Sequence, residues 1–301
     1  PCASRRRHTR EREWSRGLGD VYKRQALFIW WFSTGLILYL DGLPRATFAW
    51  SMTGATIILV AALAGLVMSA SDATPMGAFV AFTCAVVCWG WQEMTLYLGL
   101  ITGPRRGPAA PGARGWTRLI HATQAILYHE VAILVMGLLI VALTWAGANQ
   151  VGMWTYMILW WMRLSAKFNI FLGVPNHSAE FLPQQIAYLE SYFKKQSMNL
   201  LFPVSVTVAT AATVLLLVAA GRADAGSFEQ VSLTLLGALC ALALLEHWFF
   251  VLPIDVTKLW GWGFASRDGG PAAGETDDER PRWDRDKVAS AEKVVYRAGA
   301  V

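Results

Sequence analysis

Long apolar segments alternate with short polar ones along most of the chain. Each apolar segment is close to the roughly 20 residues that an α-helix needs to cross the hydrocarbon layer of a bilayer. The seven segments cover residues 26–43, 50–68, 77–100, 121–145, 151–173, 199–220 and 228–252. Pro and Gly occur between them, where residues that stop helices are expected. Backbone polar groups in lipid must be satisfied internally, and the alternation typical of a membrane barrel is absent. The pattern therefore predicts seven transmembrane helices.

The charged residues are distributed in the same way. The chain has 301 residues, 55% of them apolar, with 26 basic and 21 acidic side chains. Only 21 charged residues lie within residues 26–264, far below the roughly 25% of a soluble domain. This composition excludes a single soluble globule and a disordered chain. The net charge of +5 comes from loops and tails, so nucleic acid is not an expected partner. We predict an all-α polytopic membrane protein whose first partner is the lipid bilayer.

The two ends differ from the middle. Residues 1–25 lack the apolar core of a signal peptide, and residues 17–25 (GLGDVYKRQ) resemble a translated sequencing-adaptor read-through. We therefore expect residues 1–25 to be non-native. Residues 26–264 are expected to form the membrane domain. Residues 265–301 carry charges of both signs and few apolar side chains, which predicts a disordered, charged cytoplasmic tail.

Basic residues are concentrated in alternate loops. The first, third and fifth loops contain Arg45, Arg105, Arg106, Arg114, Arg118, Lys194 and Lys195. Among the even-numbered loops, only the last has a basic residue, Arg222. The positive-inside rule then places the odd loops and the C-terminus in the cytoplasm and the N-terminus outside. In the fifth loop, residues 182–195 place Ile186, Leu189 and Phe193 on one face, which predicts a short interfacial helix on the cytoplasmic surface.

Ionisable residues lie at one depth in four of these apolar segments, the third, fourth, fifth and seventh. An ionisable side chain in a transmembrane segment costs about 2.5 to 3.5 kcal/mol on insertion scales, so each one needs a partner or a function. With a rise of about 1.5 Å per residue, they lie roughly 8 to 14 Å from the predicted cytoplasmic boundary. This predicted polar cluster comprises Glu93, His129, Glu130, Arg163, Lys167, Glu246 and His247.

The polar cluster has three interpretations. In the first, Arg163 and Lys167 neutralise the carboxylates in a buried ion-pair network that fixes helix packing. In the second, Glu and His side chains bind a metal. Di-metal carboxylate bundles use Glu-x-x-His, which places both ligands on one face of a helix, whereas the Glu and His residues here are adjacent and point about 100° apart. In the third, His129 or His247 ligates the metal of a pigment or porphyrin while Trp89 packs against the macrocycle. We assign no metal ligands from the sequence.

Other chemistries have little support. The chain contains no GxSxG, Walker, GxGxxG or HExxH motif, so catalytic residues are unknown. A non-enzymatic role is preferred, and an enzymatic one is left open.

Several motifs resemble a known family. They include FTCAVVCWGWQEMTLYLG, QAILYHE, NQVGMWTYMILWWMRLSAKFNIFLGVPN, FLPQQIAYLESYF and LEHWFFVLP. These segments are similar to the photosynthetic complex assembly protein 2 family of purple phototrophic bacteria, over residues 26–264. The resemblance supplies no catalytic residues that can be transferred to this chain.

The resemblance implies a location and a role. It implies a multi-pass protein of the bacterial inner or intracytoplasmic membrane. The positive-inside rule then gives this protein a periplasmic N-terminus and a cytoplasmic C-terminus. Its implied role is assembly of the photosynthetic reaction centre or light-harvesting complex, whose subunits would be its partners. Bacteriochlorophyll or a precursor is the implied candidate ligand. The pigment interpretation of the polar cluster, and not the resemblance, gives His129, His247 and Trp89 as its candidate contacts. The alternative is a membrane-embedded Glu/His metalloenzyme of tetrapyrrole or lipid metabolism.

Overall fold

All the named elements in the part of the chain that the structure describes are helices. This computed structural model describes residues 2–177 and 179–267, with side chains from Val21 onward. The long helices are α1 Cys2–Asp41, α2 Phe48–Ser69, α3 Pro75–Tyr97, α4 Gly115–Thr144, α5 Val151–Leu172, α6 Leu201–Arg222 and α7 Phe228–Phe249. The short elements are η1 Arg45–Thr47, η2 Ala179–Phe181, η3 Gln184–Tyr192, η4 Val256–Trp260 and α8 Gly261–Phe264.

Polar side chains in the loops determine where several helices begin. Thr74 accepts a hydrogen bond from the Gly77 amide at 3.1 Å and starts α3, with Pro75 as the first residue. Ser227 starts α7 in the same way by accepting from the Gln230 amide at 3.1 Å. Such caps satisfy amides that the first helical turn leaves without partners. The helix limits are therefore encoded locally.

Asparagine side chains also connect neighbouring helix ends. Asn199 accepts from the first amides of α6 through Oδ1 and donates through Nδ2 to the Gly173 carbonyl at 2.9 Å. This bond holds the start of α6 against the end of α5. At the opposite end of the bundle, Asn149 Nδ2 donates to the Ser69 carbonyl at 3.0 Å, and Oδ1 accepts from the Val151 amide. Asn149 thereby joins the end of α2 to the start of α5.

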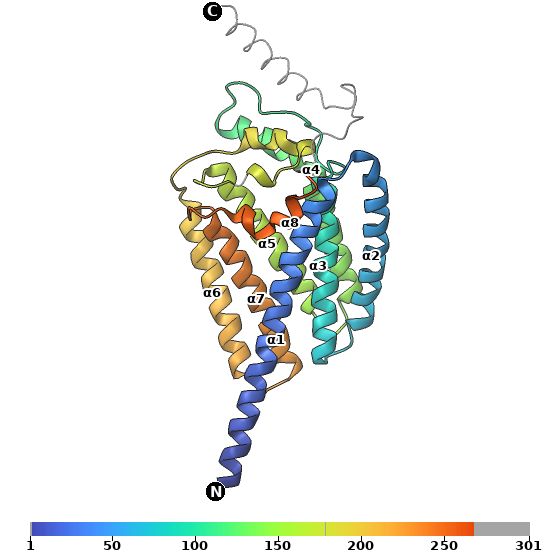
Figure 1. Ribbon diagram of the computed structural model, residues 1–301, viewed down its shortest axis with the longest axis vertical. Helices are drawn as coiled ribbons and strands as arrows, with labels where there is room; N and C mark the ends of the chain where they lie inside the picture. Colours follow the sequence, from blue (N-terminus) through green and yellow to red (C-terminus); the bar gives the residue numbers. More distant parts are fainter. Residues whose placement is uncertain (1, 178, 268–301) are drawn as a thin grey trace, which may run out of the picture.

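The seven long helices form one bundle (Figure 1). Successive helices run in opposite directions, and the pairs α2–α3 and α6–α7 pack most extensively. Helices α3, α5 and α7 are in mutual contact, and α1 lies against α3 and α7. The short helices gather at the end of the bundle away from the N-terminus (Figure 1). We call this the capped end; it contains η1 to η4, α8 and residues 98–114 and 173–200.

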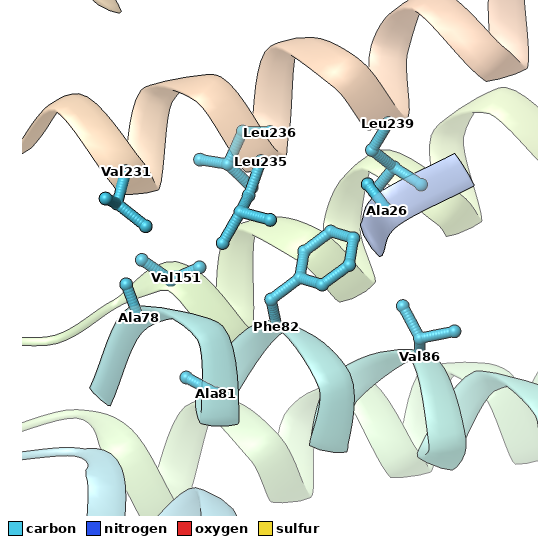
Figure 2. Close-up of a cluster of buried hydrophobic side chains, with 10 residues drawn as sticks. All are labelled: Ala26, Ala78, Ala81, Phe82, Val86, Val151, Val231, Leu235, Leu236 and Leu239. Carbon is cyan, nitrogen blue, oxygen red and sulfur yellow. The ribbon is translucent and has the colours of Figure 1, made fainter. Parts of the chain in front are cut away.

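A large apolar core lies between α1, α3, α5 and α7 (Figure 2). Phe82 of α3 projects toward Leu235 and Leu239 of α7, and only 1% of its surface is exposed. Ala78 and Ala81 on the same helix leave room for this close approach. Small residues at such contacts let helices pack tightly where no hydrophobic effect drives association in lipid.

The C-terminal segment of the described chain lies across α1 at the capped end. Trp31 Nε1 donates to the Leu259 carbonyl at 2.7 Å, and Trp260 Nε1 donates to the Trp31 carbonyl at 2.8 Å. A Cβ atom on Gly263 would lie 2.7 Å from the Gly35 carbonyl oxygen. Glycine at this crossing therefore allows α8 to approach the backbone of α1. The segment covers one side of the bundle rather than leaving the membrane domain at the end of α7.

The structure contains a long helix at each of the seven predicted positions, and an all-helical protein is confirmed for the described residues. Five helices, α2, α3, α4, α6 and α7, are long and apolar enough to cross a membrane. Helices α1 and α5 do not reach that apolarity, because α5 carries Arg163 and Lys167 and α1 continues into a charged N-terminal half. That α1 and α5 cross the membrane therefore remains a prediction.

A short helix is present where the fifth predicted loop was expected to form one. It is the 3-10 helix η3, and its Ile186 and Leu189 side chains are buried. They pack on Leu96 of α3 and Ala125 of α4, inside the protein. Phe193 follows in an extended conformation, so the predicted single helix over residues 182–195 is shorter than expected. The predicted tail beyond Arg267 lies outside the described residues.

Candidate functional site

Two ion pairs join α5 to its neighbours near the capped end. Arg163 Nη2 lies 2.8 Å from Glu93 Oε2 of α3, and Lys167 Nζ lies 2.5 Å from Glu130 Oε1 of α4. The two cations are four residues apart and therefore share one face of α5. Thus α5 is attached on one face to α3 and α4 by paired charges, as the structural interpretation of the polar cluster predicts.

Glu246 of α7 has a different kind of partner. Its Oε1 accepts a hydrogen bond from Nε1 of Trp30 in α1 at 2.6 Å. The two residues are 216 positions apart in the chain, so nothing in the local sequence indicated the pair. The cluster therefore contains two cations, each paired with a carboxylate, and a third carboxylate held by an indole.

The two predicted histidine ligands are directed elsewhere. His247 is 1% exposed, with Nδ1 at 2.9 Å from the Ala243 carbonyl and Nε2 at 3.0 Å from Ser165 Oγ. A carbonyl only accepts, so Nδ1 carries the proton and Nε2 accepts from the serine hydroxyl. Ser165 is in turn 3.0 Å from Ser205 Oγ, which accepts from Asn169. A metal bound at His247 would have to displace one of these hydrogen bonds.

His129 is fully buried in α4, and neither ring nitrogen has a hydrogen-bond partner among the described residues. Its backbone amide donates to the Thr102 carbonyl at 3.0 Å. The loop containing Thr102 therefore packs directly on α4. A Cβ atom on Gly103 would lie 2.0 Å from the Gln124 carbonyl oxygen, which explains why glycine is needed at this position.

Two adjoining cavities border the polar cluster. The outer cavity, of about 270 Å³, lies nearer the capped end and is lined by Arg163, Lys167, Ile186, Leu189 and other residues. The inner cavity, of about 150 Å³, is lined by Phe82, Trp89 and Glu93 among others. Residues that line both cavities include Thr34, Tyr97, Arg163, Phe181 and Glu246.

The exposed part of Arg163 faces these cavities. Its side chain is 34% exposed, whereas that of its partner Glu93 is 10% exposed. Because Arg163 lines both cavities, its free surface points into the protein interior and does not require contact with lipid. A cation oriented this way is suited to meeting a polar group inside the bundle.

The structure brings together part of the predicted site. Glu93, Arg163, Lys167 and Glu246 line one or both cavities, and Glu130 contacts the cavity-lining Lys167. His129 and His247 are not among the lining residues of either cavity. Trp89 lines the inner cavity and packs edge-to-face on Tyr156, with ring centroids 5.4 Å apart. Trp89 therefore remains a candidate ligand contact, while the two histidines lie outside the cavities.

The sequence did not identify several cavity residues. Phe181 and Leu182 precede η3, and Val256 and Trp260 come from η4. They reach the outer cavity only because the loop after α5 and the segment after α7 fold back over the helix ends. No spacing or composition in either segment signals that position.

The metal interpretation finds no support in the geometry. Among the residues that the structure describes, no group of three or more His, Cys, Asp and Glu side chains could hold a metal ion. The cations also occupy the carboxylates of Glu93 and Glu130. A metal at the polar cluster would have to compete with both ion pairs.

Comparison with known proteins identifies relatives but no solved fold. The chain is 42% identical over 240 residues to the uncharacterized 30.4 kDa protein in the puhA 5′ region of Rhodobacter capsulatus, an alignment covering 78% of this chain and 87% of that protein. No solved structure matches the chain. A family model described as "Protein of unknown function (DUF3623)" matches residues 21–270. The chain therefore belongs to the DUF3623 family.

Proposed function

We propose that the protein is an integral inner-membrane assembly factor for the bacterial photosynthetic reaction centre and light-harvesting complex. The observation that carries the proposal is the gene position of the Rhodobacter capsulatus relative, which is named for the region 5′ of puhA, a photosynthesis gene region. The motif resemblance to the photosynthetic complex assembly protein 2 family points the same way. Five helices apolar enough to cross a bilayer fit a role at the membrane where such complexes are built.

Within this proposal the two cavities and the charges around Arg163 form the functional centre. Their polar groups are held by ion pairs from separate helices, so the cavities are largely pre-formed, as ligand sites usually are. Binding of bacteriochlorophyll or a precursor through His129 or His247 stays a prediction. It would require those imidazoles to leave their present buried positions. A ligand in the cavities would instead meet Arg163, Tyr97 and Glu246.

Deletion of the gene in a phototrophic host tests the proposed role. We expect the near-infrared absorption of the reaction-centre and light-harvesting bands in isolated membranes to fall several-fold, and the wild-type gene to restore it. A gene with Arg163→Met should restore it poorly, whereas Lys258→Met, which alters a side-chain pair exposed by 82% and 52%, should restore it fully. Wild-type absorption in the deletion strain would refute the proposal. If the absorption does fall, co-purification of the protein with reaction-centre or light-harvesting subunits would identify the subunit that it assembles.

The predicted orientation can be tested in the same host. The proposal places the capped end in the cytoplasm and the α2–α3 and α6–α7 turns in the periplasm. Single cysteines introduced at Asp224 and Lys194 should react with a membrane-impermeant maleimide from opposite sides of the membrane. Labelling of both positions from one side would contradict this orientation.

A further inference from the structure

The outer cavity is lined by segments that are far apart in the sequence. Helices α3, α4, α5 and α7 form its walls, and η2, η3 and η4 contribute to the side at the capped end. Its lining is mainly aliphatic and aromatic, and includes Ile126, Ile170 and Phe250. Charged groups are confined to the part near Arg163, Lys167 and Glu246. The cavity therefore has an apolar body and one polar side, which is the arrangement that binds an amphiphile in a fixed orientation.

The volume limits the size of the occupant. An apolar cavity of about 150 Å³ holds benzene, which corresponds to about 25 Å³ per heavy atom. On that scale the outer cavity of about 270 Å³ holds about 11 heavy atoms. A tetrapyrrole consists of four pyrrole rings and their bridges, so it would need on the order of 600 Å³. A macrocycle is therefore too large to lie wholly within the outer cavity, whereas a medium-length hydrocarbon chain or a substituted single ring fits.

The charges limit the head group of the occupant. Arg163 and Lys167 each already have a carboxylate partner, in Glu93 and Glu130. Glu246 adds a further carboxyl group, held by Trp30. No cation is in surplus within this polar cluster, so an anionic head would be buried without a counter-charge. A cationic head could pair only with Glu246, which already accepts from Trp30, and it would lie beside the like charges of Arg163 and Lys167 on the same side of the cavity. Burying a charge without a counter-charge, or beside like charges, is costly.

Hydrogen-bonding capacity does remain in the polar cluster. Arg163 and Glu246 line the outer cavity; Arg163 Nη2 donates to Glu93, and Glu246 accepts from Trp30 through Oε1, which leaves Oε2 of Glu246 as a candidate acceptor. Lys167 Nζ makes its bond to Glu130 and lines the outer cavity with the rest of its surface. The polar side thus offers both donors and acceptors, which a hydroxyl group can use at the same time.

We propose that the outer cavity binds one small uncharged amphiphile, a hydrocarbon of about 11 heavy atoms with a hydroxyl head group directed at Arg163, Lys167 and Glu246. The inference rests on the proposed function for its choice of this cavity as the functional centre, and it deepens that function by naming the ligand class. It does not assign the ligand a place in a reaction.

Direct binding to the full-length protein in lipid nanodiscs tests the inference. The probe is radiolabelled 1-decanol, which has the expected size, with empty nanodiscs as the background. We expect saturable binding of one decanol per protein. Decanoate and decylammonium have the same chain with a charged head, and they should compete at least about tenfold more weakly. Absence of saturable binding, or a charged analogue that competes as well as decanol, would overturn the proposal, as would displacement by a zinc porphyrin.

Three variants of α4 test whether binding occurs in this cavity. Ala122→Phe fills the outer cavity and should abolish saturable binding, whereas Val131→Phe, on an exposed face of the same helix, should leave it unchanged. Ile126→Ala enlarges the cavity and should shift the preference from 1-decanol to 1-dodecanol, a change that a misfolded protein would not produce. Equal binding by Ala122→Phe and wild type, or unchanged chain preference in Ile126→Ala, would contradict the assignment.

The binding experiment and the gene-deletion experiment test two separate claims, the ligand class and the assembly role. If decanol does not bind while gene deletion still lowers the absorption of the photosynthetic complexes, the ligand class is wrong and the assembly role stands. If decanol binds at this cavity while deletion has no effect on those complexes, the assembly role is wrong and the ligand site stands.

Discussion

Removing the Arg163 guanidinium should destabilise the protein, because the Glu93 carboxylate would lose its cation. In Arg163→Met, Glu93 Oε2 loses its only described ion pair, at 2.8 Å, and Glu93 Oε1 already has no hydrogen-bond partner among the described residues. Breaking a buried ion pair by removing one partner typically costs about 3–5 kcal/mol. The adjoining inner cavity of about 150 Å³ can admit a few water molecules, which favours the lower end, about 3 kcal/mol.

The double variant should behave in the opposite way. Arg163→Met combined with Glu93→Leu replaces both charges by apolar side chains, which is often nearly neutral, so we expect a loss of no more than about 1 kcal/mol. The free energy of unfolding would be measured in mixed micelles with increasing dodecyl sulfate, using tryptophan fluorescence. Lys258→Met serves as control, with an expected change below about 0.5 kcal/mol, because its partner Asp255 is half exposed. A double variant as unstable as the Arg163→Met single variant would refute the idea that an unpaired carboxylate causes the loss.

Three further changes test the packing. Gly103→Ala places a Cβ atom 2.0 Å from the Gln124 carbonyl oxygen, and should cost at least about 2 kcal/mol in the same unfolding assay, because backbone has to move. Phe82→Ala should cost about 3–5 kcal/mol in that assay, because the side chain is 1% exposed in the central core. Asp41→Ala removes the carboxylate that accepts two hydrogen bonds from Arg267, at 2.6 and 3.0 Å. Cleavage by a protease between α7 and α8 should then become about tenfold faster.

Each of these outcomes can be contradicted. Wild-type stability of Gly103→Ala would mean that the loop does not pack on α4 as described. A loss below about 1 kcal/mol in Phe82→Ala would show that the core collapses around the missing ring. Unchanged cleavage of Asp41→Ala would mean that the C-terminal segment is held to α1 by its tryptophan contacts alone.

Part of the candidate site was accessible from the sequence. Glu93, Arg163, Lys167 and Glu246 were predicted to share a depth, and they do lie around adjoining cavities. Their depth follows from counting residues from the helix ends, because a helix rises by a constant amount per residue. The direction of a side chain around the helix axis depends instead on how the neighbouring helices pack. For that reason the same counting placed His129 and His247 in the site, although neither is among the residues that line the two cavities.

The sequence by itself determined that the chain is helical and where each long helix lies. Lipid offers no partner for backbone amides and carbonyls, so an apolar segment of sufficient length has to satisfy them within its own helix. Local caps such as Thr74 and Ser227 then set where individual helices start.

Only the tertiary structure decided which charges pair and where space remains. The hydrogen bond from Trp30 to Glu246 joins segments separated by most of the chain. The outer cavity likewise brings Trp260 together with residues from the first helix. Such contacts depend on the relative rotation and order of the helices, which in lipid are set by the shape of their packed side chains and by interhelical polar contacts. Those properties belong to pairs of surfaces, and no single segment of the sequence contains both.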